Sequence, residues 1–113
     1  MKKLFIAIFM LVSSFGTNVM ADGHAIKMGI ILGFTGPIES LTPAMAGSAE
    51  LAFKEASDSG SLLGGKKIEV VRADSTCVDS AAATAAAEGV ISQGVAAIMG
   101  ADCSGVIGAI ASN

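Results

Sequence analysis

The chain has no tryptophan and no tyrosine, and it has few basic residues. Of its five phenylalanines, only Phe34 and Phe53 lie beyond residue 21, so an aromatic platform for stacking sugars or bases is not expected. Residues 22–113 hold five basic residues against ten acidic ones. This negative balance argues against a nucleic-acid partner, because nucleic-acid binding requires basic surface that replaces counterions.

The chain also lacks an apolar run long enough to cross a membrane. Two lysines follow Met1, residues 4–12 are all apolar, and small residues lead to Ala21. A transmembrane helix needs about 20 apolar residues, and polar residues interrupt this run too early. The pattern is typical of a secretory signal peptide over residues 1–21 that is cleaved after Ala21. We therefore expect an exported protein.

Cysteine is scarce, since the chain contains only Cys77 and Cys103. In an exported chain two cysteines predict one disulfide, with two free thiols as the alternative. Cys103 also stands between a predicted strand and a predicted helix, where a nucleophile is often placed. A catalytic cysteine needs a nearby base, usually histidine, and the only histidine, His24, precedes the first strand. An exported hydrolase or amidase that uses Cys103 remains the alternative function.

Apolar runs and helix signals alternate along the rest of the chain. Strands are predicted at residues 26–33, 67–73 and 95–99, and helices at residues 42–58, 79–94 and from 104 onward. Thr42, Asp79 and Ser104 are the predicted N-caps of these helices. The order β-α-β-α-β-α predicts an α/β fold, in which a parallel sheet has right-handed crossovers and helices on both faces.

The predicted sheet is incomplete. Three parallel strands leave a long unpaired edge and bury little surface. We therefore expect a fragment of a longer sheet with the strand order 2-1-3-4-5, truncated after about three β-α units. Residues 22–113 would then be the N-terminal part of one lobe.

The candidate site lies at the carboxyl ends of the strands, because ligands of open α/β sheets bind where the winding direction switches. The loops there are residues 34–41 and 100–104. The second loop runs into a helix, whose free N–H groups and dipole favour an anion such as a carboxylate. The Ser104 hydroxyl can donate to that anion or only cap the helix. Glu39 and Asp102 can meet a ligand ammonium or be solvated surface acids.

Two other ligand classes find little support. Gly29, Gly33 and Gly36 suggest a phosphate loop, but they do not match the dinucleotide fingerprint, and Pro37 follows where a helix should begin. A lone histidine, His24, is weak evidence for a metal. We therefore expect no cofactor.

Three segments carry the most specific marks in the chain: IKMGIILGFTGPIESL, GGKKIEVVRADSTCVDSAAATAAAEGVISQGVAAIMG and GADCSG. The marks are T-G-P after the first strand, the L-G-G-K turn, D-x-x-C after the second strand and C-S after the third. Over residues 26–113 the chain resembles the N-terminal lobe of type 1 periplasmic solute-binding proteins. Within these, it is most similar to the leucine/isoleucine/valine receptors of ABC importers.

The resemblance implies a two-lobed periplasmic receptor that closes on a solute, passes it to the permease subunits of an ABC importer and does no chemistry. The expected solute is an amino acid of the branched-chain type or a similar small carboxylate or amide. The receptor is expected to be a monomer. A sensor receptor that uses the same lobe is a further alternative.

The resemblance also implies roles for single residues. Ser104 matches the serine that holds the solute's α-carboxylate, and Cys77 pairs with Cys103. Leu41 stands where the family often places an aromatic residue beside the solute side chain. The expected ligand-binding residues are Phe34, Leu41, Asp102, Cys103 and Ser104.

Overall fold

The structure is a computed structural model that describes residues 25–113. The predicted signal peptide, residues 1–21, and its cleavage site lie outside the described residues. Within residues 25–113, none of the helices has the length and apolar character needed to cross a membrane.

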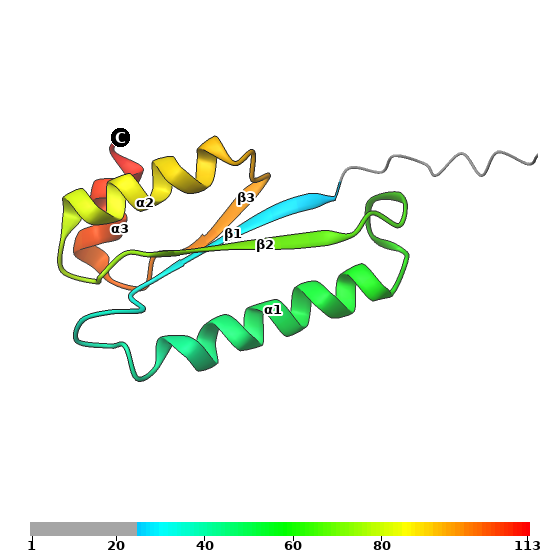
Figure 1. The fold of residues 1–113 in the computed structure, drawn as a ribbon, viewed down its shortest axis with the longest axis horizontal. Coiled ribbons are helices and arrows are strands. Elements are labelled where there is room, and N and C mark those ends of the chain that lie inside the picture. Colours follow the sequence, from blue (N-terminus) through cyan, green and yellow to red (C-terminus); the bar gives the residue numbers. More distant parts are fainter. Residues whose placement is uncertain (1–24) are drawn as a thin grey trace, which may run out of the picture.

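Three strands alternate with helices in the predicted order, which confirms the α/β class. The elements are β1 (Ile26–Leu32), α1 (Thr42–Asp58), the short 3-10 helix η1 (Leu62–Gly64), β2 (Ile68–Asp74), α2 (Ser80–Ser92), β3 (Ala97–Gly100) and α3 (Ser104–Ala111). Figure 1 shows α1 on one face of the sheet and α2 and α3 on the other. The predicted boundaries agree to within two residues: β3 begins at Ala97 rather than at residue 95, and α2 ends at Ser92 rather than at residue 94.

The strands form one parallel sheet in the order β2-β1-β3. This is the 2-1-3 part of the predicted order. The central position of β1 follows from its composition, because a strand covered on both faces is an almost continuous apolar run. In β1, residues 29–32 are all buried. Ile30 pairs with Arg72 of β2 on one side and with Met99 of β3 on the other.

Successive residues of β1 supply two separate cores, because strand side chains point alternately to opposite faces. Ile30 and Leu32 pack with Ala46 of α1. Ile31 packs with Ala87 and Val90 of α2. Both faces of the sheet are therefore covered, as the sequence predicted.

Gly29 allows α2 to lie close to β1. A Cβ atom at this position would lie 2.6 Å from Cγ1 of Val90 and 3.1 Å from Cγ1 of Ile98. Since real Cβ atoms do not approach other heavy atoms so closely, any larger residue here would push α2 away from the sheet.

Of the three predicted N-caps, only one is correct. Asp79 accepts hydrogen bonds from the backbone N–H groups of Ala81 and Ala82, at 2.9 and 3.0 Å. The prediction for Thr42 is wrong, because its buried hydroxyl donates to the Gly33 carbonyl at 3.0 Å and the N-cap is the preceding residue. The prediction for Ser104 is also wrong, because Ser104 is the first helical residue of α3 and the N-cap is the preceding residue, Cys103.

Candidate functional site

The loops at the carboxyl ends of the strands form the candidate site, and they contact one another closely. They comprise residues 33–41, 75–79 and 101–103, which follow β1, β2 and β3. Gly36 has a φ of +94°, and a Cβ atom there would lie 2.4 Å from the carbonyl oxygen of Thr76. Only glycine fits this backbone conformation and this approach. The first and second loops are therefore in direct backbone contact.

A disulfide joins the second loop to the third. Cys77 and Cys103 are bonded, with their Cα atoms 5.2 Å apart. Because β1 lies between β2 and β3, the disulfide crosses over the end of the central strand. The thiolate is the nucleophilic form of cysteine, so Cys103 offers no nucleophile while this bond is intact.

Asp102 ties the third loop to the end of β1. The Gly33 N–H group donates to both carboxylate oxygens, at 3.2 Å to Oδ1 and 3.0 Å to Oδ2. Gly33 is buried and Asp102 is half-buried. The sequence suggested a ligand ammonium as the partner of this acid, whereas the structure shows a backbone amide. The carboxylate thereby pairs an N–H group that lies past the end of its strand.

Asp74 holds the first loop from the other side. Its Oδ1 accepts from the Thr35 and Thr76 amides at 3.2 and 2.8 Å, and its Oδ2 accepts from the Thr35 hydroxyl at 2.5 Å. Partial burial disfavours the charged carboxylate, but the hydrogen bonds from Thr35 and Thr76 outweigh it and hold the pKa of Asp74 below its usual value. The ionised form of Asp74 is therefore part of the folded loop.

This lowered pKa predicts a loss of stability in acid. A depressed folded-state pKa contributes stability above the ordinary carboxyl pKa, and that contribution is lost as the pH falls through the lowered value. Asp74→Asn should cost ~1 kcal/mol at neutral pH and flatten the fall in stability toward pH 3. Urea unfolding between pH 7 and pH 3 measures both effects. The control is Glu39→Gln, which changes an exposed acid of the same loop; equal acid sensitivity of wild type and Asp74→Asn would contradict the prediction.

Phe34 begins the first loop and lies half-buried against the α1-side core. The guanidinium of Arg72, on β2, lies over its ring with Cζ 5.5 Å from the ring centroid. Arg72 in turn donates from Nε and Nη2 to the two carboxylate oxygens of Glu50 on α1, at 2.5 and 2.7 Å. The sequence analysis placed Phe34 at the solute site but missed Arg72, because its contacts join three separate elements.

The remaining predicted site residues are open to solvent. Leu41 is 60% exposed and is the N-cap residue of α1. Ser104 is exposed at the start of α3. No side chain caps α1 or α3, whereas Asp79 caps α2. The two helices that follow the predicted site loops therefore begin with amide groups that no side chain pairs.

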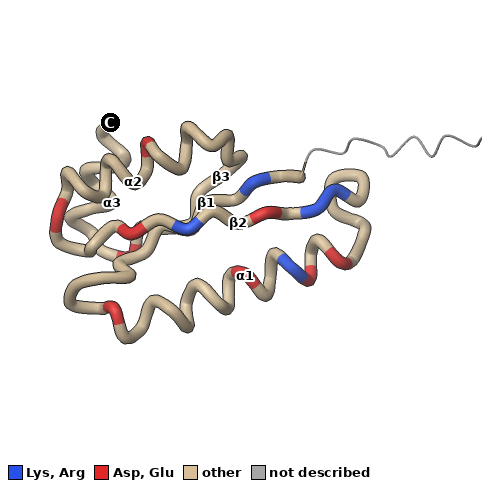
Figure 2. Tube along the Cα trace, in the orientation of Figure 1, with Lys and Arg blue, Asp and Glu red and all other residues tan. Residues whose placement is uncertain are grey.

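The charged side chains within the three loops are all acidic. The three loops contain Glu39, Asp79 and Asp102 and no lysine or arginine. In Figure 2 the blue segments, which mark lysine and arginine together, lie on the strands, on α1 and near the turn before β2 rather than in these loops. In residues 25–113, no three histidine, cysteine or acidic residues lie together as a metal site would require.

A groove of about 410 Å³ lies elsewhere, between α1 and β2. Its lining residues are Glu50, Phe53, Lys54, Ser57, Asp58, Lys67, Ile68 and Val70. None of the predicted ligand-binding residues is among them. The candidate site therefore does not coincide with this groove.

The fold and the tied loops define an α/β lobe that presents a surface at the carboxyl ends of a parallel sheet. The family model of periplasmic binding proteins matches residues 25–113, and the chain belongs to this family. A search of curated protein sequences finds no significant match. Family membership gives the chain a solute-binding role and indicates a periplasmic location.

Proposed function

We propose that the chain belongs to the solute-binding subunit of an ABC importer and binds an amino acid of the branched-chain type or a similar small carboxylate or amide. The subunit acts as a monomer, closes a second lobe over the solute and presents it to membrane permease subunits. It catalyses no reaction. Its family membership supports solute binding, and the negative charge of the loops is compatible with a solute that carries an ammonium group.

One observation carries the proposal: the pattern of helix caps. α2, which follows the second loop, is capped by Asp79, but α1 and α3, which follow the two predicted site loops, have no side-chain cap. A solute carboxylate can accept the free N–H groups at the start of α3. The exposed Ser104 hydroxyl adds a further donor to the same anion.

The other site residues complete a small binding surface. Leu41 offers an exposed apolar side chain to the side chain of the solute. Phe34 packs against the core at the start of the first loop. The disulfide of Cys103 and the hydrogen bond of Asp102 to Gly33 hold the backbone that leads into α3. Because Cys103 is bonded to Cys77, a hydrolase that uses Cys103 as its nucleophile is less well supported than solute binding.

A thermal-shift panel of the 20 standard L-amino acids, their amides and small carboxylic acids tests this function. A ligand that binds only the folded state raises the melting temperature, so we expect a rise with at least one L-amino acid. Ser104→Ala should weaken that binding about fivefold, as expected for the loss of one hydrogen bond. Ser48→Ala, which changes an exposed serine on α1, should leave it unchanged. No response to any amino acid would contradict the proposed solute class.

A further inference from the structure

Arg72 and Asp74 place two polar side chains of β2 beside the first loop. They are two residues apart in one strand, so they lie on the same face of the sheet, the face covered by α1. Val70, two residues earlier, packs into the core on that face. Arg72 lies over Phe34, and Asp74 binds Thr35, the next residue of the loop. The carboxyl end of β2 thus contacts two consecutive residues, Phe34 and Thr35, at the start of the loop.

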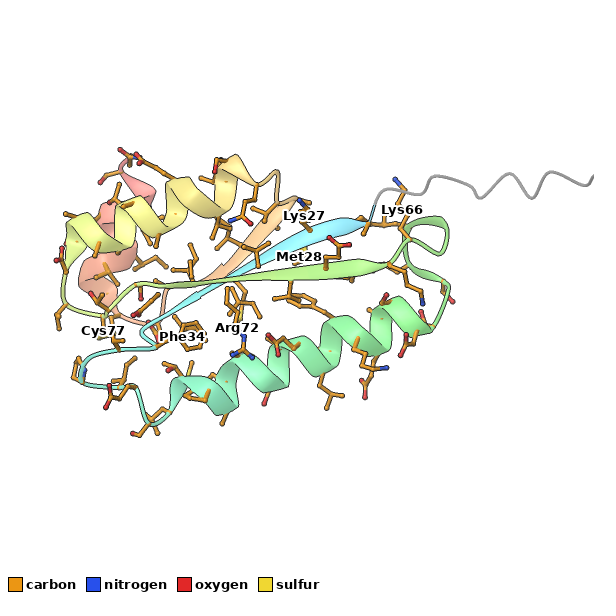
Figure 3. The ribbon with its side chains drawn as sticks, viewed as in Figure 1. Lys27, Met28, Phe34, Lys66, Arg72 and Cys77 are labelled. Atoms are coloured by element: carbon orange, nitrogen blue, oxygen red, sulfur yellow. A yellow bond between two sulfur atoms is a disulfide. The ribbon has the colours of Figure 1, made fainter. Side chains whose placement is uncertain are left out.

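Glu50 fixes the orientation of Arg72. Two parallel hydrogen bonds to one carboxylate, at 2.5 and 2.7 Å, hold the planar guanidinium in a single orientation. Glu50 also holds the pKa of Arg72 above its usual value, chiefly through these hydrogen bonds. Figure 3 shows Arg72 extending from β2 toward α1 with Phe34 next to it.

These contacts contribute little to global stability. The side chains of Arg72 and Glu50 are 44% and 35% exposed, and exposed ion pairs stabilise proteins only weakly. What the pair supplies is geometry, because a guanidinium fixed at its far end sets where an aromatic ring can lie beneath it. The ring belongs to the residue from which the loop of residues 34–41 departs.

We propose that Arg72 is a positioning residue of the solute site, and that its guanidinium, held by Glu50, sets the position of the Phe34 ring and of the loop that follows. The inference rests on the proposed function, since this loop carries Leu41 and is one of the two that line the proposed site. Arg72 acts through Phe34 and does not contact the solute.

Solute affinity gives the first test, with the L-amino acid that produces the largest thermal shift as the probe. Arg72→Gln should raise its Kd about two- to fivefold, in line with the loss of a partly exposed cation–π contact. Arg72→Lys should raise the Kd less, because an ammonium keeps the positive charge but loses the two parallel N–H donors of the guanidinium. Glu50→Gln should also weaken binding while leaving Arg72 in place. The melting temperature should fall by only a few degrees in each variant.

Lys54→Gln is the matched control for these variants. It breaks the exposed ion pair between Lys54 and Asp58 on α1, the helix that also carries Glu50. Its Kd should equal that of the wild type. An unchanged Kd in Arg72→Gln, or an equal loss in Lys54→Gln, would overturn the assignment.

A second test reads the position of the ring without any solute. Because the chain contains no tryptophan, Phe34→Trp introduces a single indole. Its emission and its quenching by acrylamide should change when Arg72→Gln is added and should not change when Lys54→Gln is added. The backbone amide resonances of residues 34–41, compared between wild type, Arg72→Gln and Lys54→Gln, give the same comparison with Phe34 intact. Spectra that do not respond to Arg72→Gln would overturn the proposal.

The two tests separate the two ideas. If no amino acid shifts the melting temperature, the proposed solute class fails, and the spectra alone decide whether Arg72 positions the loop. If an amino acid binds but neither its Kd nor the spectra change in Arg72→Gln, the proposed function stands and the positioning role fails.

Discussion

Replacing both Cys77 and Cys103 by serine should lower the free energy of unfolding by about 3.5 kcal/mol on the chain-entropy model. The two residues are 26 positions apart, and the bond restricts a loop of that size in the unfolded chain. In the folded protein the same bond holds the second and third loops together across the end of β1. The variant should therefore lose solute affinity as well as stability.

Urea unfolding of the oxidised protein and of the double variant measures this loss. Dithiothreitol provides the matched control, because it should reduce the stability of the wild type to that of the double variant and leave the double variant unchanged. Thiol counting on the unreduced, denatured protein should find no free thiol. Two reactive thiols, or equal stability of the two proteins, would contradict the prediction and return Cys103 to the candidates for a nucleophile.

Much of the fold could be predicted because the relevant signals are local. The apolar run of β1, the alanine-rich stretch of α2 and the Asp79 cap depend on neighbours in the sequence, and all three appear in the structure. The sequence also suggested the pairing of Cys77 with Cys103, because the chain has only two cysteines.

The site was harder to predict because its contacts join distant residues. Asp102 binds a residue 69 positions away, and Arg72 binds one 22 positions away. Local signals misled at Thr42, a residue type that favours N-caps but whose hydroxyl instead binds the end of β1. An acid in a loop has the same sequence signature whether it meets water, a solute or a backbone amide, and only the fold distinguishes these partners.

Asp102 gives the second large expected effect. Asp102→Ala removes both acceptors of the buried Gly33 N–H group, and an unpaired buried donor costs about 1–3 kcal/mol. Asp102→Asn keeps one side-chain oxygen that can accept the same hydrogen bond, so its loss should be smaller. Urea unfolding of both variants measures the difference, with Glu39→Ala as the control for removing an exposed acid from the neighbouring loop.

The comparison between alanine and asparagine also separates the two roles considered for Asp102. If the carboxylate serves only as an anchor, solute affinity should follow stability, and Asp102→Asn should bind almost as well as the wild type. If the charge also meets the ammonium of the solute, Asp102→Asn should lose affinity while its stability is nearly unchanged. Equal stability of wild type and Asp102→Ala would contradict the anchoring role, because the Gly33 amide would then have another partner.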